Sequence, residues 1–228
     1  MPAKLIPYDF TRRSEPEMRV RADELLAEMR RRRSCRFFSD EPVPRDLIER
    51  VIEIAHSSPS GANRKPWRFV AVDDPQLKRE IRLAAEKEER ENYGRRFPPE
   101  WLEALEPIGT DAQKPFLEVA PWLVVLFRVD WEMLNGERVH NYYPVESTGI
   151  AAGMFVMACH QVGLATLTDT PSPMKFLRDL LGRPVNEKAY LLMPVGYPAV
   201  DCQVPDIPKK PLEQALQWNR GDHMESDV

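Results

Sequence analysis

The pattern of hydrophobic and polar positions along the chain predicts both helices and strands. From Pro44 onward, apolar residues recur with the period of about 3.6 that marks a helix, at Leu47, Ile48, Val51, Ile52 and Ala55. Further helices are expected over residues 16–32, 75–95 and 174–181, and apolar or β-branched runs predict strands at 67–72, 122–127, 164–168 and 190–195. Helices and strands do not alternate strictly, which favours an α+β sandwich.

Residues 143–162 are apolar around nearly the whole helical circumference, with no clear polar face. Such a helix is expected to be buried on every side. Its small residues Gly149, Ala151, Ala152 and Gly153 would let another backbone approach closely. We therefore expect this helix to form a subunit interface.

Composition narrows the class of protein. The chain has 228 residues, 43% of them hydrophobic, which is enough for one sizeable core. A net charge of −4 argues against a nucleic-acid partner. The longest apolar stretch, Gly149 to Cys159, is about half of what a membrane span needs, so we expect a soluble protein with no membrane partner. Three cysteines without CxxC spacing fit a reducing, cytoplasmic compartment.

No metal site is expected. Cys159 and His160 are adjacent, so on a helix their side chains point about 100° apart and are poorly placed to bind one ion together. His56 and His140 lack partners at ligand spacing.

A basic segment runs from Arg31 to Arg36 and places four arginines around Ser34 and Cys35. Forked guanidinium groups with a hydroxyl are suited to a phosphate dianion. The alternative interpretation is a solvated helix end or a localisation-like basic patch.

Two turns have the composition of cofactor loops. The segment 59–63, PSGAN, has small side chains and free backbone amides that would let a planar ring approach. The segment 166–171, TLTDTP, ends a predicted strand with three hydroxyls and a carboxylate, and a threonine there could bond a cofactor heteroatom. Ordinary turn chemistry is the alternative interpretation of the first segment, and strand-end turns often have the composition of the second.

The segment 86–93, EKEERENY, places Glu89 and Tyr93 one helical turn apart on the same face. Lys114 follows downstream, before an apolar segment. An acid, a phenol and an amine that converge would clamp the ammonium and carboxylate of a free amino acid. The alternative is a solvated helix face on which Glu86 and Arg90 form an i,i+4 ion pair.

Nine segments, in order over roughly residues 25–215, resemble the nitroreductase superfamily and, within it, the iodotyrosine deiodinase family. They are RRSCRFFSDEPVP, PSGANRKPW, EKEERENY, KPFLEVAP, NYYPVES, GLATLTDTPSP, LLGRP, LLMPVGYP and VPDIPKKPL. The resemblance implies a nitroreductase-like α+β fold, with a mixed sheet flanked by helices. It also implies a homodimer with an exchanged C-terminal tail and two FMN sites built from both subunits.

The resemblance divides the chain into an N-terminal extension (1–24), an FMN domain (25–215) with an active-site lid (85–115), and a C-terminal tail (216–228). It places Thr168 at flavin N5 as the catalytic residue and lays Ser60 and Gly61 against the isoalloxazine. The remaining implied FMN ligands are Arg32, Arg33, Ser34, Cys35, Arg36, Asp169, Thr170 and Lys209. Lys209 stands where the family usually has arginine, and Asp169 where a hydroxyl residue is common.

The implied substrate ligands are the backbone at Ala62 and the side chains of Glu89, Tyr93 and Lys114. The implied activity is FMN-dependent reductive dehalogenation of halogenated tyrosines to tyrosine and halide. NADPH would be the ultimate electron donor, through a separate flavin reductase. The alternatives are a general NAD(P)H-dependent nitro or quinone reductase, which would be indifferent to an amino-acid group, and a flavin-holding protein without turnover.

Overall fold

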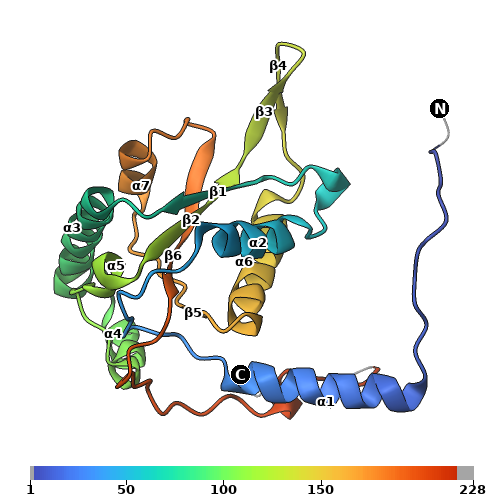
Figure 1. Cartoon of the computed structure of the whole chain (residues 1–228). Helices are drawn as coiled ribbons and strands as arrows, with labels where there is room; N and C mark the ends of the chain where they lie inside the picture. Colours follow the sequence, from blue (N-terminus) through green and yellow to red (C-terminus); the bar gives the residue numbers. More distant parts are fainter. Residues whose placement is uncertain (1–2, 220–228) are drawn as a thin grey trace, which may run out of the picture.

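The computed structural model describes residues 3–219, and an antiparallel sheet of four strands lies at its centre, in the order β1-β2-β6-β5 (Figure 1). The strands are β1 (Trp67–Val72), β2 (Trp122–Val129), β5 (Ala165–Thr166) and β6 (Glu187–Gly196). In the described part of the chain, the one parallel pairing is an isolated bridge between Ser34 and Thr166 at the β5 edge. The predicted α+β class with helices flanking the sheet is confirmed, and the three pairings between its four strands are all antiparallel.

The remaining elements surround this sheet. The helices are α1 (Glu15–Arg31), α2 (Arg45–His56), α3 (Pro75–Glu91), α4 (Pro99–Leu105), α5 (Phe116–Val119), α6 (Pro144–Gln161) and α7 (Lys175–Leu180). A π-helical turn η2 (Asn92–Arg96) continues α3, and short 3-10 turns are η1 (Gly61–Asn63), η3 (Glu106–Ile108) and η4 (Leu212–Gln214). A separate hairpin pairs β3 (Trp131–Leu134) with β4 (Glu137–His140).

Strand β2 is apolar from Trp122 to Phe127 because both faces of the sheet are covered there. Trp122, Val124 and Leu126 belong to a hydrophobic cluster with α2 and α6. Leu123, Val125 and Phe127 alternate with them and belong to a second cluster, with α3, α5 and α7. The sheet therefore separates the molecule into an α6 face and an α3 face, and each face carries part of the candidate site.

Local sequence explains where the main helices begin. The carboxylate of Asp74 accepts a hydrogen bond from the Leu77 amide at 2.7 Å and caps α3, whose first residue is Pro75. Helix α6 likewise begins at a proline, Pro144. Pro44, predicted as the first helical residue, stands one position before α2 and caps it.

Several boundaries differ from the sequence prediction. The strand expected at 164–168 shortens to Ala165–Thr166, because the backbone oxygen of Thr166 pairs with the amide of Cys35 at 3.2 Å. The β3–β4 hairpin was not predicted, although Asn135 and Gly136 supply the two positive φ angles, 53° and 84°, of a two-residue hairpin turn.

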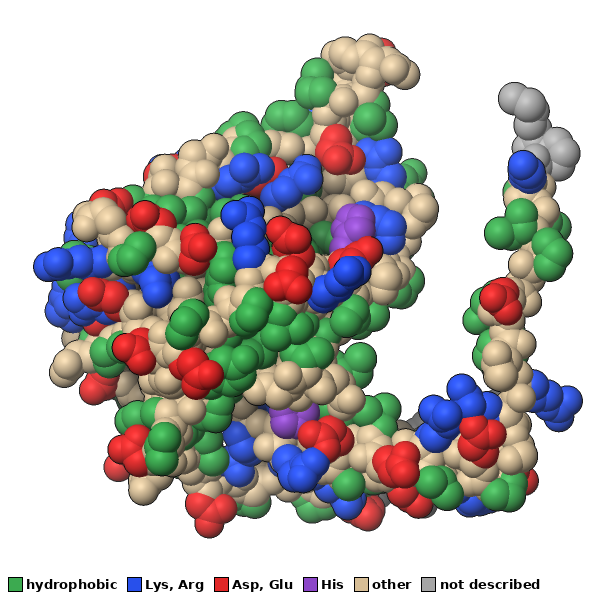
Figure 2. Space-filling model, viewed as in Figure 1, with side chains coloured by type: hydrophobic (Ala, Val, Ile, Leu, Met, Phe, Trp, Pro, Cys, Tyr) green, Lys and Arg blue, Asp and Glu red, His purple; other side chains and the backbone are tan. Residues whose placement is uncertain are grey.

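The bounds of α6 agree with the prediction, but the expected burial on every side is wrong for the single chain. One face, with Ala151, Phe155 and Cys159, is buried, whereas Ile150 is 46% exposed and Val145 is 42% exposed. Figure 2 shows hydrophobic side chains gathered on the body over α6 and above α1. The uncovered apolar face of α6 is therefore available for contact with another protein surface.

Both ends of the described part of the chain extend away from the body. The described residues before α1 form an extended arm that stands away from the domain. The segment after β6 runs beneath α1 (Figure 1). The predicted boundary between residues 24 and 25 falls inside α1, and residues 220–228 of the predicted tail lie outside the described part of the chain. Between residues 3 and 219, none of the helices has the length and apolar character that crossing a membrane requires.

Gly196, the last residue of β6, provides a test of the packing at the sheet edge. An added Cβ would stand 2.5 Å from Cδ and 2.9 Å from Cγ of Pro121, a rigid ring next to β2. We expect Gly196→Ala to lower the free energy of unfolding by about 1–3 kcal/mol in urea titrations. Gly94→Ala is the control, because a Cβ there meets nothing within 4 Å. Equal stabilities of the two variants would contradict this packing.

Candidate functional site

The three predicted clamp residues converge. The ammonium of Lys114 lies 3.1 Å from Oε2 of Glu89, and both side chains are buried. The same ammonium lies 5.8 Å from the ring centre of Tyr93. In this arrangement the acid and the amine satisfy each other, and together they offer one negative and one positive group for exchange with a zwitterion.

Helix α3 brings Glu89 into the interior because its buried face is polar at one end. The apolar stripe of Ile81 and Ala85 continues into Glu86, Glu89 and Asn92, all buried. The solvated face considered for this segment is therefore wrong. Glu86 accepts from Arg82, at 3.0 and 3.2 Å, and the proposed Glu86–Arg90 pair does not form.

Three residues that sequence reasoning missed hold the clamp in place. The amide of Asn92 donates to Oε1 of Glu89 at 3.1 Å and to the Ser172 carbonyl at 2.8 Å. Glu86 accepts from the backbone amide of Lys114 at 2.9 Å. Thr110 accepts from the Lys114 ammonium at 3.2 Å through its hydroxyl and from the Tyr93 phenol at 3.1 Å through its carbonyl. The i,i+3 spacing of Glu86, Glu89 and Asn92 was the available signal.

The predicted lid, residues 85–115, folds as the end of α3, η2, α4 and η3. Its last part forms one wall of a cavity of about 520 Å³. Ser34, Arg36 and Phe37 contribute the opposite wall, and the tail segment 203–205 closes a third side. Thr110, which holds both Tyr93 and Lys114, lines the same cavity. The cavity thus lies between the lid and the basic segment, and it reaches the clamp only through Thr110, because Glu89, Tyr93 and Lys114 are not among its lining residues.

Residues 32–44 connect α1 to α2, and the arginines of the basic segment at the start of this connection point in several directions. Arg32 and Ser34 line a second cavity of about 240 Å³, Arg36 lines the lid cavity, and Ser34 lines both. The guanidinium of Arg33 donates to the carbonyl of Pro205 in the tail. The thiol of Cys35 is buried against Cys202.

The second cavity has the features of a phosphate-bearing cofactor site. Besides Arg32 and Ser34, its lining includes the hydroxyl residues Thr166 and Thr168 and the small α6 residues Ala152 and Gly153. Guanidinium and hydroxyl donors suit a phosphate, and small side chains allow a flat ring to approach. Thr168 and Thr170 are both exposed, whereas Asp169 between them pairs through its backbone with Leu192.

The loop of Ser60, Gly61 and Ala62 is rigid and strained. Ala62 and Asn63 adopt positive φ angles of 49° and 52°, a conformation that costs energy in residues other than glycine. Ser60 accepts from the Lys65 amide at 2.8 Å. Gly61 is required, because a Cβ there would stand 2.9 Å from the Tyr142 carbonyl.

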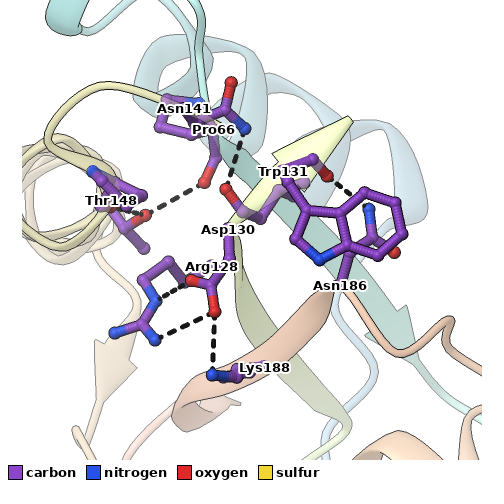
Figure 3. A network of polar contacts seen from close by, with 10 residues as sticks. Pro66, Arg128, Asp130, Trp131, Asn141, Thr148, Asn186 and Lys188 are labelled. Carbon is purple, nitrogen blue, oxygen red and sulfur yellow. Dashed lines mark hydrogen bonds and ion pairs between the residues drawn. The ribbon is translucent and has the colours of Figure 1, made fainter. Parts of the chain in front are cut away.

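A polar network holds the far end of this loop. Figure 3 shows the Pro66 carbonyl bonded to Thr148 of α6, at 3.2 Å, beside Asn141 and Asp130 at the base of the hairpin. Burial opposes ionisation of Asp130, but hydrogen bonds from Arg128 and Lys188 outweigh it and keep the pKa of this carboxyl below its ordinary value. The network fixes the loop, the hairpin and α6 to one another.

Ser60 and Gly61 do not join the other predicted cofactor residues within one chain. The Gly61 amide donates to Ser147, in the first turn of α6, at 3.2 Å. The second cavity is lined by Ala152, Gly153 and Val156, roughly 8–14 Å farther along the helix axis. Lys209 lies on the extended tail and is exposed.

Asp169 carries an orphaned carboxylate oxygen. Its Oδ2 is buried and has no hydrogen-bond partner among the described residues. Burial is the main cause that raises the pKa of Asp169 to about 6, and the charge of Glu89 adds to it, while Lys114 and Arg36 act in the opposite direction. The ionisation of Asp169 therefore depends on the charges of both Glu89 and Lys114.

Comparison with known proteins agrees with this geometry. Residues 29–197 match the model of the nitroreductase family. The iodotyrosine deiodinase of Haliscomenobacter hydrossis is 50% identical over 90% of this chain and 93% of its own, and iodotyrosine deiodinase 1 of Mus musculus is 43% identical over 92% and 75%. A crystal structure of oxidised iodotyrosine deiodinase bound to FMN and 3-iodo-L-tyrosine superposes with a TM-score of 0.76 at 28% identity, over 86% of this chain and all of that one.

The raised pKa of Asp169 predicts a pH-dependent gain in stability for Asp169→Asn. The folded chain binds this proton more tightly than the unfolded chain, whose carboxyl has the ordinary value of 3.8. The stability that the proton confers is complete below about pH 4 and is lost as pH rises through about 6. We expect Asp169→Asn to be more stable than the parent by about 2–3 kcal/mol at pH 8, and equal to it at about pH 4, in denaturant titrations.

Asp201→Asn removes an exposed carboxylate and serves as the control, with no such pH dependence expected. If Asp169→Asn and the parent kept the same difference at both pH values, Asp169 would not be the titrating group.

Proposed function

Because the chain belongs to the nitroreductase family and, within it, to the iodotyrosine deiodinase family, we propose that it reductively dehalogenates halogenated tyrosines. The substrates in this proposal are 3-iodotyrosine, diiodotyrosine and their bromo or chloro counterparts, and the products are tyrosine and halide. FMN, when bound, supplies the electrons for this reaction. The chain is accordingly an FMN-dependent oxidoreductase.

The observation that carries the proposal is the buried pair of Glu89 and Lys114, 3.1 Å apart. A free amino acid presents the same two charges. Its ammonium would take the place of Lys114 at Glu89, and its carboxylate would take the place of Glu89 at Lys114. The exchange replaces this one ion pair with two, so the zwitterion can enter without leaving either buried charge alone. A general nitro or quinone reductase would be indifferent to an amino-acid group on its substrate, so it would not require this pair of buried charges.

Tyr93 and the backbone at Ala62 complete the proposed grip. The Tyr93 phenol now donates to the Thr110 carbonyl, at 3.1 Å, and would turn to the substrate carboxylate. The folded lid excludes water from these groups, which strengthens each charged hydrogen bond. The substrate is thereby held by its amino-acid end while its ring extends toward the flavin.

The residues around the second cavity fit FMN. We propose that Arg32, Arg33, Ser34, Cys35 and Arg36 hold its phosphate and ribityl chain, with Cys35 acting through its backbone because its thiol faces Cys202. Thr168 would donate to flavin N5, with Asp169 and Thr170 beside it. Lys209 would add a positive charge from the tail. The lining of the cavity supports the assignment of Arg32, Ser34 and Thr168.

We further propose a homodimer with exchanged C-terminal tails, in which each flavin site uses Ser60 and Gly61 of the second copy. The distance along α6 between these residues and the cavity supports it, since one chain does not bring them together. The uncovered apolar residues Ile150 and Val145 on α6, and Leu25 and Leu26 on α1, would be buried in that dimer.

NADPH as the ultimate electron donor and a separate flavin reductase as the intermediary complete the proposal, together with a cytoplasmic location. Free thiols at Cys35, Cys159 and Cys202 support a reducing compartment. Flavin bound to the purified protein should then be reduced slowly by NADPH alone and quickly when a flavin reductase is added.

The clamp predicts a loss of substrate affinity when either charge is removed. We expect Glu89→Gln and Lys114→Met each to weaken 3-iodotyrosine binding about 10- to 100-fold, because each loses a charge-assisted hydrogen bond. Quenching of FMN fluorescence measures the affinity, and iodide release by dithionite-reduced protein measures turnover. Glu103→Gln neutralises an exposed lid carboxylate and should change neither. Unchanged affinity in both clamp variants would refute the assignment.

The dimer predicts that an ionised side chain on the open face of α6 separates the subunits. We expect Ile150→Asp to sediment as a monomer, to keep its far-ultraviolet circular dichroism and to lose most of its affinity for FMN. Leu83→Asp makes the same change at an exposed position of α3 and should remain dimeric and bind FMN. A monomeric Ile150→Asp variant with full FMN affinity would show that one chain suffices for the flavin site.

A further inference from the structure

Two of the three cysteines meet where the basic segment contacts the C-terminal tail. The Sγ atoms of Cys35 and Cys202 lie 3.6 Å apart, although 167 positions separate the two residues in sequence. Cys35 is buried and Cys202 is partly exposed. Both pack against the hydrophobic cluster on the α3 face of the sheet. The proposed dehalogenation has no role for either thiol.

Backbone hydrogen bonds keep the two cysteines in place. The Ser39 amide donates to the Tyr197 carbonyl and the Ala199 amide donates to the Phe37 carbonyl, each at 2.9 Å, so the two segments run side by side. The amide of Cys35 is itself fixed to Thr166 at 3.2 Å. A disulfide has an S–S bond of about 2.05 Å, so the sulfurs need to approach by roughly 1.5 Å, a distance within the range of side-chain rotation.

We propose that Cys35 and Cys202 are a redox modification site, which closes to a disulfide when the chain meets a small-molecule disulfide such as oxidised glutathione. The Cys202 thiolate, the accessible one, attacks the reagent's S–S bond and forms a mixed disulfide, and one reduced thiol leaves. The Cys35 thiolate then attacks the Cys202 sulfur, the Cys35–Cys202 bond forms, and the second thiol leaves. The protein loses two electrons and two protons, and both are gained by the two released thiols.

Burial makes the second step slow at neutral pH. It raises the pKa of the Cys35 thiol to about 12, and the neighbouring Cys202 thiol adds to the rise. Since the thiolate is the nucleophile, closure should accelerate as the pH is raised above neutrality. At neutral pH the pair would therefore close slowly, in response to sustained rather than brief oxidation.

The disulfide would fasten the tail to the basic segment. Cys202 directly precedes residues 203–205, which line the lid cavity together with Ser34 and Arg36. Arg33 already donates to Pro205, so a covalent bond would reinforce an existing contact. We expect bound FMN to leave the oxidised protein more slowly. This consequence rests on the proposed function, whereas the disulfide itself does not.

The test is oxidation of the full chain with oxidised glutathione at pH 8, followed by thiol titration in denaturant and peptide mass spectrometry under non-reducing conditions. The parent and Cys159→Ala, which retains the pair, should each lose two thiols, yield a Cys35–Cys202 peptide within one chain and melt at a higher temperature. Cys202→Ser should lose none. A glutathione adduct on Cys202 that persists, or a disulfide to Cys159 or between chains, would overturn the proposal.

The link to the cavity is measured separately, by the rate of FMN release from oxidised and reduced parent protein. Release several-fold slower after oxidation supports the link. An equal rate with a mapped disulfide would refute the link. If the protein bound no FMN, the proposed function would fail, and the peptide map would still decide whether the disulfide forms.

Discussion

A buried ion pair between Glu89 and Lys114 is the interaction on which the site depends. Removing two charges from water is costly, and the cost is offset only when the partners are close and their remaining hydrogen bonds are satisfied. Here Asn92 bonds the free oxygen of Glu89, and Thr110 accepts from Lys114. Glu89 and Lys114 are therefore already buried and hydrogen-bonded in the folded chain. A zwitterion that bound between them would leave neither charge without a partner.

The fold explains why this pair is found where it is. The sheet is covered on both faces, so α3 must turn one side toward the core, and the polar end of that side carries Glu89 inward. The opposite face carries α6, which has an apolar side that the single chain leaves uncovered. One chain thus brings together Glu89, Tyr93 and Lys114, whereas the proposed flavin site combines residues near the start and the middle of α6 that one chain does not bring together.

Local patterns in the sequence were sufficient for most of the helices and strands, although not for the β3–β4 hairpin, and for the shared helix face of Glu89 and Tyr93. The strand Trp67–Val72 and the start of α3 at Pro75 follow from composition and capping, and the i,i+4 spacing of Glu89 and Tyr93 fixes their common face. Contacts between distant segments were not predictable in this way. Thr110 and Ser172 reach the clamp through loops, and the approach of Cys35 to Cys202 depends on how the tail returns to the body. The exposure of Ile150 was missed because an apolar helix gives the same pattern whether its own chain or another one covers it.

In the proposed mechanism of binding, the two charges of the clamp separate to receive the two charges of an amino acid. The most direct test is the affinity of the FMN-loaded protein for 3-iodotyrosine, for 3-iodotyramine, which lacks the carboxylate, and for 2-iodophenol, which lacks both charges. Affinity should fall by about tenfold or more at each step, and Lys114→Met should abolish the difference between the first two compounds. Equal binding of all three compounds to the parent protein would contradict the account.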